Sequence, residues 1–216
     1  MTDELELLKK DWQKKTADLP TLSYEEIHKM IWKKSSSIVK WILIISILEF
    51  TLPQLLIFAP PMGDAMQVYE QIGVSKYLFA LSIFIYAVAL YFIFQFYTRF
   101  KEISVLDNSK NLMKKIIKTR KTVKHYVIFS LSMIMVSVII MLIGVYLNEN
   151  ITDAFPELKE GLDKISPDKL RVTLMLVIGI TGICLTLFMG GVYNLLYGLL
   201  LKKLKGNYKE LKQLAF

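Results

Sequence analysis

The stretch YVIFSLSMIMVSVIIMLIGVYL, residues 126–147, decides the fold class of this chain. It contains no charged side chain, and as a helix it is long enough to cross a bilayer core of roughly 30 Å. Backbone N–H and C=O groups inside hydrocarbon must bond within their own segment, which favours a helix. Three further blocks have the same character, at residues 41–58, 77–97 and 172–201. We therefore predict an all-α integral membrane protein, a four-helix bundle with helical cytosolic extensions.

Positive charge is concentrated on one side of these spans. Of the 27 Lys and Arg residues, eight fall in residues 1–40, nine in residues 99–124 and five from residue 202 onward. The two loops on the other side hold the remaining five. The positive-inside rule places the richer side in the cytosol, and an even number of spans brings both termini there. We expect a multi-pass protein of a bacterial inner (plasma) membrane. The orientation of the spans in the membrane accounts for the net charge of +8. The sequence contains no motif for nucleic-acid recognition, so we do not expect a nucleic-acid partner.

The charged segments between the spans are also expected to be helical. Residues 1–37 should form amphipathic cytosolic helices, and Ser23 and Glu26 fit a capping box within them. Residues 38–201 form the four-span domain, with a cytosolic helical hairpin at 99–124, and residues 202–216 form a cytosolic C-terminal helix. Each extension carries an apolar stripe that must be buried against something. We expect the extensions to pack together. In the first helix we predict that Leu5, Leu8 and Trp12 bind a partner.

Glu49 is the only acidic residue inside a predicted span. A charge near the bilayer centre costs about 2.5–3.5 kcal/mol on insertion scales, so such a residue is a candidate for function. Ser46 and Gln54 are close to it in sequence, and Asn194 is a polar residue of the fourth span. Two alternatives stay open. Glu49 accepts a proton, binds a cation or pairs with a partner's basic residue; or it is a protonated carboxyl hydrogen-bonded to a serine or tyrosine of a neighbouring helix.

Small and weakly polar residues recur at helical spacing in the last two spans. Such residues let helix backbones approach closely, and Asn can hydrogen-bond between helices. They predict either packing inside the bundle or the face of a homodimer. The fourth span carries them at every fourth position, at Gly182, Thr186, Gly190, Asn194 and Gly198. The third span carries them at every seventh position, at Ser130, Ser137 and Gly144.

Several chemistries have no matching residues in the sequence. The two histidines cannot by themselves make a structural zinc site, which needs four ligands. A di-iron bundle needs about four inward Glu residues, and the spans offer one. We therefore predict no catalytic residue, metal or cofactor. The predicted function is a non-enzymatic membrane scaffold or regulator, embedded in the lipid bilayer, that presents a basic helical cytosolic face to a protein partner. The alternative is a small transporter or channel component built around Glu49.

Two segments near the N-terminus resemble a known family. ELELLKKDW at residues 4–12 and HKMIWKKSSSIVKW at residues 28–41 look like small four-span membrane proteins of Bacteroidota-type bacteria. The resemblance implies an inner-membrane location and no activity, since that family has no known function. Its members often carry the label β-carotene 15,15′-monooxygenase. That label does not fit, because carotenoid cleavage oxygenases are β-propellers that hold iron with four histidines, and this sequence has two.

Overall fold

The computed structural model describes Glu6, residues 23–56, 62–104, 108–148, Ile151 and residues 166–214. Over these residues the chain is helical and holds no strand, as the apolar blocks predicted. The partner-binding candidates Leu5, Leu8 and Trp12 lie outside the described residues. The elements follow the chain as α2 (Tyr24–Leu56), α3 (Met62–Gln71), α4 (Ser75–Ser104), α5 (Ser109–Leu147), α7 (Pro167–Tyr193), the π-helix η2 (Asn194–Gly198) and α8 (Leu199–Leu214).

Local capping explains where two of these helices begin. At the start of α2, the Glu26 carboxylate accepts hydrogen bonds from the backbone N–H and the hydroxyl of Ser23, at 2.8 and 2.9 Å. The backbone N–H of Glu26 donates back to the Ser23 hydroxyl at 3.3 Å, which completes the predicted capping box. At the start of α5, Asn108 accepts from the backbone N–H of Asn111 at 2.9 Å.

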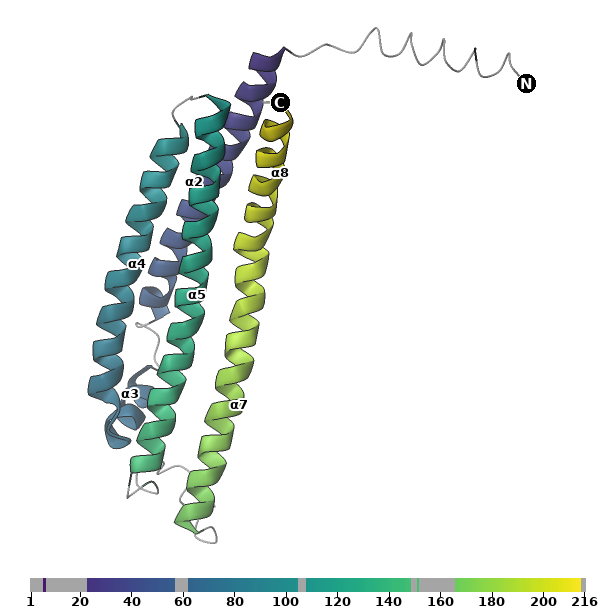
Figure 1. Cartoon of the computed structure of the whole chain (residues 1–216). Coiled ribbons are helices and arrows are strands. Elements are labelled where there is room, and N and C mark those ends of the chain that lie inside the picture. The colour runs from purple at the N-terminus through teal and green to yellow at the C-terminus, as the bar shows by residue number, and fades with distance from the viewer. Residues whose placement is uncertain are drawn as a thin grey trace.

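The long helices run side by side, and one end of the bundle collects most of the charge. The start of α2, the turn from α4 to α5 and the end of α8 lie together (Figure 1). We call this the basic end, and the opposite end, with α3 and the start of α7, the far end. Around the bundle, α2 contacts α4 and α8, while α5 contacts α4, α7 and α8.

Four helices are long and apolar enough to cross a membrane, with mean hydropathy between 1.6 and 2.7. This architecture fits a multi-pass membrane protein, while the identity of the membrane and the cytosolic side stay predictions. The fourth helix is continuous from Pro167 to Gln213, 47 residues including η2. Such a helix is about 70 Å long, so it extends well beyond a bilayer core. The predicted protrusion of the fourth span is therefore present.

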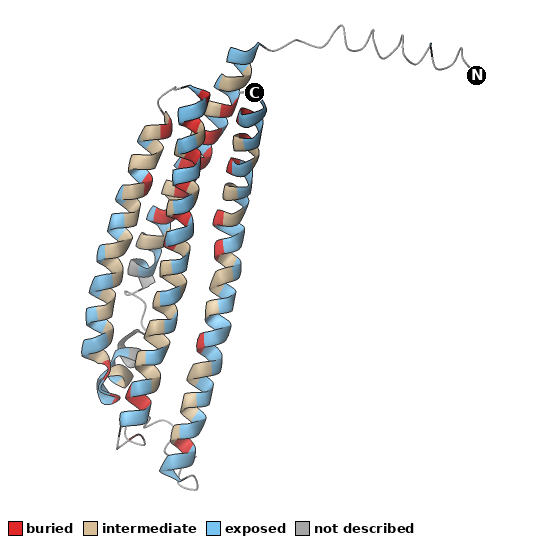
Figure 2. Ribbon diagram, viewed as in Figure 1, coloured by how far each residue is buried: buried red, intermediate tan, exposed pale blue. Residues whose placement is uncertain are grey.

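The main hydrophobic core lies at the basic end and extends into the start of the apolar blocks, rather than in the middle of the bundle. Ile103, Ile116, Leu204 and Leu211 are fully buried there. Figure 2 shows buried residues gathered toward the same end. The physical reason is the solvent. Helix extensions in water gain about 1.5–3 kcal/mol for each large apolar side chain they bury, whereas lipid tails solvate such side chains in the membrane. The extensions of all four spans thus pack together, as expected.

Two hydrogen bonds between helices add polar specificity to this core. Asn207 of α8 donates its side-chain Nδ2 to the Ser35 hydroxyl of α2 at 2.9 Å, and both residues are buried. The indole Nε1 of Trp32 donates to the carbonyl of Ile103 at 2.7 Å, close to the end of α4. Because an unpaired buried polar group costs free energy, these bonds fix how α2 lies against its neighbours.

A second, smaller core closes the far end. The turn between α3 and α4 passes through Gly73, whose φ of +79° suits glycine. Ile72 then packs against Gly144 of α5, where a Cβ would lie 2.9 Å from its Cγ2 methyl. Asn148 Nδ2 donates to the carbonyl of Gln71 at 2.8 Å. These contacts attach the start of α4 to the end of α5.

The four-helix arrangement holds only toward the basic end. Past Glu49, α2 continues to Leu56, about 10 Å, whereas α5 continues past Tyr126 to Leu147, about 32 Å. Figure 1 shows α2 ending partway along the bundle, so that α4, α5 and α7 run on beside one another.

Candidate functional site

Glu49 is held by two tyrosine hydroxyls from two other helices. Tyr126 of α5 donates to the Oε2 oxygen of Glu49 at 2.8 Å, and Tyr197 of η2 donates to the same oxygen at 2.9 Å. Both tyrosines are buried, while Glu49 is half-buried. The hydroxyl of Tyr193 also lies within hydrogen-bonding reach of this carboxyl. The carboxyl group is therefore held by tyrosine side chains of α5 and the fourth helix.

A third tyrosine completes an aromatic cluster around this carboxyl. The ring of Tyr126 meets Tyr193 and Tyr197 edge-on, with centroids 6.3 and 5.9 Å apart. Phe92 of α4 meets Tyr126 in the same way at 5.3 Å. Edge-to-face pairs add about 0.5–1.5 kcal/mol each beyond the area they bury, so the cluster holds its rings in fixed positions.

The π-helix η2 places two of these rings. Tyr193 comes directly before Asn194–Gly198, the five-residue π segment, and Tyr197 lies inside it. A π segment changes the rotation of the residues that follow it and is frequently found at functional sites. The segment η2 contains no proline. Gly198 leaves room for the side chain of Asn194, because a Cβ at position 198 would lie 2.6 Å from the Oδ1 oxygen of Asn194.

A cavity of about 290 Å³ opens beside Glu49 and is lined by all four long helices. Its polar lining, besides Glu49, comes from three serines and three tyrosines: Ser46, Ser130, Ser137, Tyr86, Tyr126 and Tyr193. The hydroxyls of Ser46 and Ser137 donate to backbone carbonyls of their own helices, at 2.8 and 2.7 Å, so their oxygens stay available as acceptors. Aromatic and aliphatic side chains form the rest of the wall: Phe50, Pro53, Ile85, Ala89, Ile93, Phe129, Met133, Ile134 and Met189.

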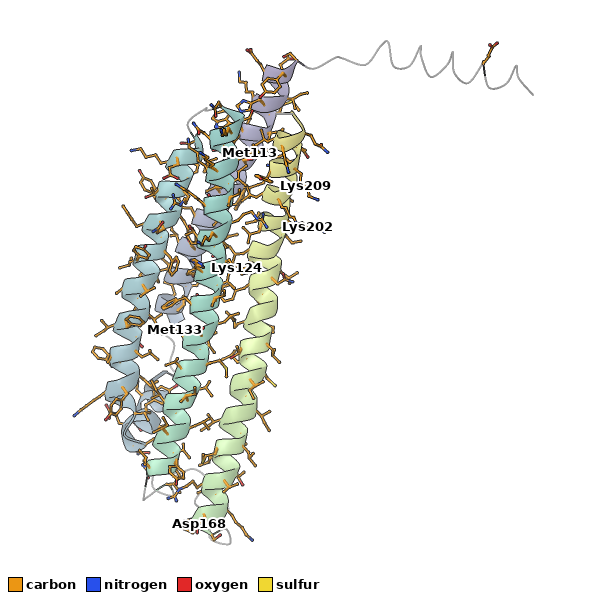
Figure 3. All side chains as sticks on the ribbon, viewed as in Figure 1. Met113, Lys124, Met133, Asp168, Lys202 and Lys209 are labelled. Carbon is orange, nitrogen blue, oxygen red and sulfur yellow. The ribbon has the colours of Figure 1, made fainter. Side chains whose placement is uncertain are left out.

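The partners of Glu49 give its level along the bundle. Tyr126 lies two residues after Lys124, and Tyr197 lies five residues before Lys202. Figure 3 shows Lys202 toward the basic end, and Lys124 and the cavity residue Met133 nearer the middle. The partners of Glu49 therefore lie within about two helical turns of these lysines.

The other predicted polar residues separate into three groups. Ser46 lies with Glu49 on the cavity wall. Gln54 belongs to α2, but its side chain lies outside what the structure describes. Asn194 is exposed and lines a different groove, between α5 and the fourth helix, so it is not part of the Glu49 cluster.

The small residues of the fourth span face mainly α5. A Cβ on Gly182 would lie 2.6 Å from both methyl groups of Val138, and Gly190 faces Leu131 at 3.9 Å. Thr186 donates to the Met135 sulfur at 3.2 Å. These contacts support packing inside the bundle over the homodimer alternative.

The heptad residues of the third span do not meet this stripe. Ser130 and Ser137 line the cavity, and Gly144 faces the turn before α4. They therefore lie on a face of α5 other than the one that contacts α7.

The sequence analysis missed the three tyrosines. Tyr126, Tyr193 and Tyr197 fall near the ends of the apolar blocks, where aromatic residues are common without any specific role. The signal that could have found them is chemical. A buried tyrosine hydroxyl needs a partner, and Glu49 is the only carboxylate that the spans offer. Among the described residues no group of three or more His, Cys, Asp or Glu side chains could hold a metal ion.

Comparison with known proteins places the chain in a family. It belongs to the domain of unknown function DUF8845, whose model matches residues 25–216. The resemblance seen in the sequence was to a family without a known function, and the family found here also has none. The bacterial origin stays a prediction. No curated protein matches the chain. No solved structure matches it either.

Proposed function

Starting from a family without an assigned function, we propose that the chain is a small membrane transporter that exchanges a monovalent organic cation for a proton at Glu49. The observation that carries this proposal is a carboxyl group anchored by Tyr126 and Tyr197 on the wall of a cavity. The predicted alternative of a transporter component thus becomes the leading function.

The charge of the cavity selects its ligand. Among the described residues that line the cavity, Glu49 is the single carboxylic acid, and no Lys, Arg or His accompanies it. An ionised carboxylate in this apolar surrounding is costly without a counter-charge. A bound monovalent cation or a bound proton each makes the site neutral, so both are favoured over the empty anion. The two ligands therefore compete for one group, which is the requirement for exchange.

The walls of the cavity favour an organic cation over a hydrated metal ion. The faces of Phe50, Phe129 and Tyr86 line it, and aromatic rings attract ammonium groups by about 0.5–2 kcal/mol each when water is excluded. A volume of about 290 Å³ is near the lower end for small-molecule pockets, which run from about 300 Å³ upward. The predicted substrate is therefore a small, partly apolar ammonium compound.

The test uses the full-length chain in proteoliposomes that contain a pH-sensitive dye. A gradient of benzyltrimethylammonium should drive proton movement in the opposite direction, and Glu49→Gln should abolish it. Glu102→Gln is the matched control, because Glu102 pairs with Arg99 on α4 outside the cavity. Its flux should equal that of the unchanged chain. The neutral carbon isostere, 2,2-dimethylpropylbenzene, should move no protons. Equal flux in the Glu49→Gln variant would refute the proposal.

The scaffold function is the second candidate, and the basic end supports it. Exposed lysines surround a well-packed core at that end, a stable surface for an acidic protein partner. Deletion of residues 1–20, which include Leu5, Leu8 and Trp12, should abolish capture of such a partner in a crosslinking pull-down. Undiminished capture would reject the N-terminal segment as the binding element. A scaffold also predicts that Glu49→Gln leaves partner capture unchanged.

A further inference from the structure

A second groove lies on the outside of the bundle, between α5 and the fourth helix. Its volume is about 550 Å³. It shares Tyr193 with the Glu49 cavity and is also lined by Tyr197, which bonds to Glu49, but its charged residues are different. Three basic residues of α5 line it toward the basic end: Arg120, Lys121 and Lys124. Farther along, its walls are aliphatic.

The charges of this groove have no counter-charge in the described part of the chain. No acidic residue lines the groove, and none pairs with Arg120, Lys121 or Lys124 there. Arg120 is half-buried, and its Nε nitrogen is enclosed without a hydrogen-bond acceptor. A guanidinium held against the bundle in this way keeps its charge but lacks a partner for it. An anion in the groove would supply that partner.

The rest of the groove is built for an apolar chain. Val127 and Ile128 on α5 and Leu201 on α8 form its walls. Gly190 and Gly198 have no side chain, which keeps the groove open on the fourth helix. Asn194 lines the same space and is exposed, so its amide can donate a hydrogen bond to an ester or phosphate oxygen.

The order of these residues along α5 matches the order of groups in a phospholipid. Lys121 and Lys124 are followed by Val127 and Ile128, so the charged rim passes into an apolar wall within about one helical turn. A phosphate group lies at the boundary of a bilayer, and its acyl chains extend inward from it. Free phosphate would use the rim but leave the apolar wall empty.

We propose that this groove is a binding site for one anionic phospholipid, with its phosphate at Arg120 and Lys124 and an acyl chain along Val127 and Leu201. The site is independent of the exchange proposed for Glu49. Its occupant would fill the space beside η2 and hold α5 against the fourth helix at the level of the tyrosine cluster.

The test is native mass spectrometry of the detergent-solubilised full chain with added phosphatidylglycerol or phosphatidylcholine of identical acyl chains. The unchanged chain should retain phosphatidylglycerol in preference to phosphatidylcholine. The double variant Arg120→Gln, Lys124→Gln should lose affinity by about fivefold for each charge removed, since one basic residue near a membrane surface contributes about 1 kcal/mol. The matched control is Lys110→Gln, Lys114→Gln on the same helix, because neither lysine lines the groove. It should retain the lipid.

Three results would overturn the proposal. Equal retention of both lipids by the unchanged chain would show that charge does not select the occupant. Equal losses in the groove variant and the control would show that the charge of the whole basic end acts, not this groove. Displacement of phosphatidylglycerol by inorganic phosphate would show a free-anion site. The lipid preference of the unchanged chain needs no variant, so the test stands even if the groove variant fails to fold.

Discussion

Replacing Gly182 by alanine should destabilise the bundle, although the same change usually stabilises a helix. Alanine gains about 1 kcal/mol over glycine inside a helix. At Gly182, however, the new methyl group would lie 2.6 Å from both Cγ atoms of Val138. Val138 is β-branched and turns with difficulty about χ1, so the helices must separate slightly. Overpacking of this kind costs about 1–3 kcal/mol, which leaves a net loss of up to about 2 kcal/mol.

The measurement is equilibrium unfolding in mixed micelles, followed by far-ultraviolet circular dichroism. Gly179→Ala is the matched control, because a Cβ there meets nothing within 4 Å, and it should be neutral or stabilising. Val138→Ala should remove the clash, so the double variant should recover about 1 kcal/mol or more relative to additivity. If Gly182→Ala matches Gly179→Ala in stability, or if Val138→Ala brings no recovery, the packing of α7 on α5 is not as described. A change in oligomeric state without coupling to Val138 would instead support the homodimer alternative.

Three further predictions concern the basic end. Asn207→Ala should cost about 1–3 kcal/mol of unfolding free energy, because the Ser35 hydroxyl loses its buried partner, and adding Ser35→Ala should return part of that loss. Trp32→Phe should cost about 1 kcal/mol in the same assay, because it removes the bond from Nε1 to the carbonyl of Ile103. The backbone N–H of Ser23, followed by its hydroxyl, holds the pKa of Glu26 below its ordinary value. Because the folded-state pKa is the lower one, this stabilisation is present at neutral pH and is lost as the pH falls through that lowered pKa. When the pH is lowered, the amides at the start of α2 should lose protection from hydrogen exchange in the unchanged chain. The loss of protection should be smaller in Ser23→Ala.

Much of the fold could be predicted because its signals are local. The apolar block at residues 126–147 predicts a helix by length alone, and the structure places it within α5. The Ser23 and Glu26 pair identifies the start of α2 because a capping box involves only one turn of helix. The first span was predicted to end at residue 58, and the last described residue of α2 is Leu56. The rotation of each helix could not be predicted in this way, because it depends on contacts between segments far apart in the chain.

The candidate site was predicted only in part, for the same reason. Glu49 was identifiable because a carboxyl in an apolar block is unusual wherever the helix lies. Its hydrogen-bond partners, Tyr126 and Tyr197, come from residues 77 and 148 positions away, and no spacing rule connects them. Asn194 also has a polar side chain, but it lines the other groove. The rotation of the fourth helix around η2 decides which of its side chains meet Glu49.

The sequence by itself determined the class of the protein, its helices and the distribution of its charge. These follow from length, apolar content and capping, which depend on residues close together in the chain. Only the tertiary structure decided which polar groups meet. It set Glu49 against Tyr126 and Tyr197 rather than Asn194, and it placed the main core at the basic end. The physical reason is that membrane helices gain little from burying apolar side chains, so close packing and a few hydrogen bonds between distant residues fix their rotation and depth.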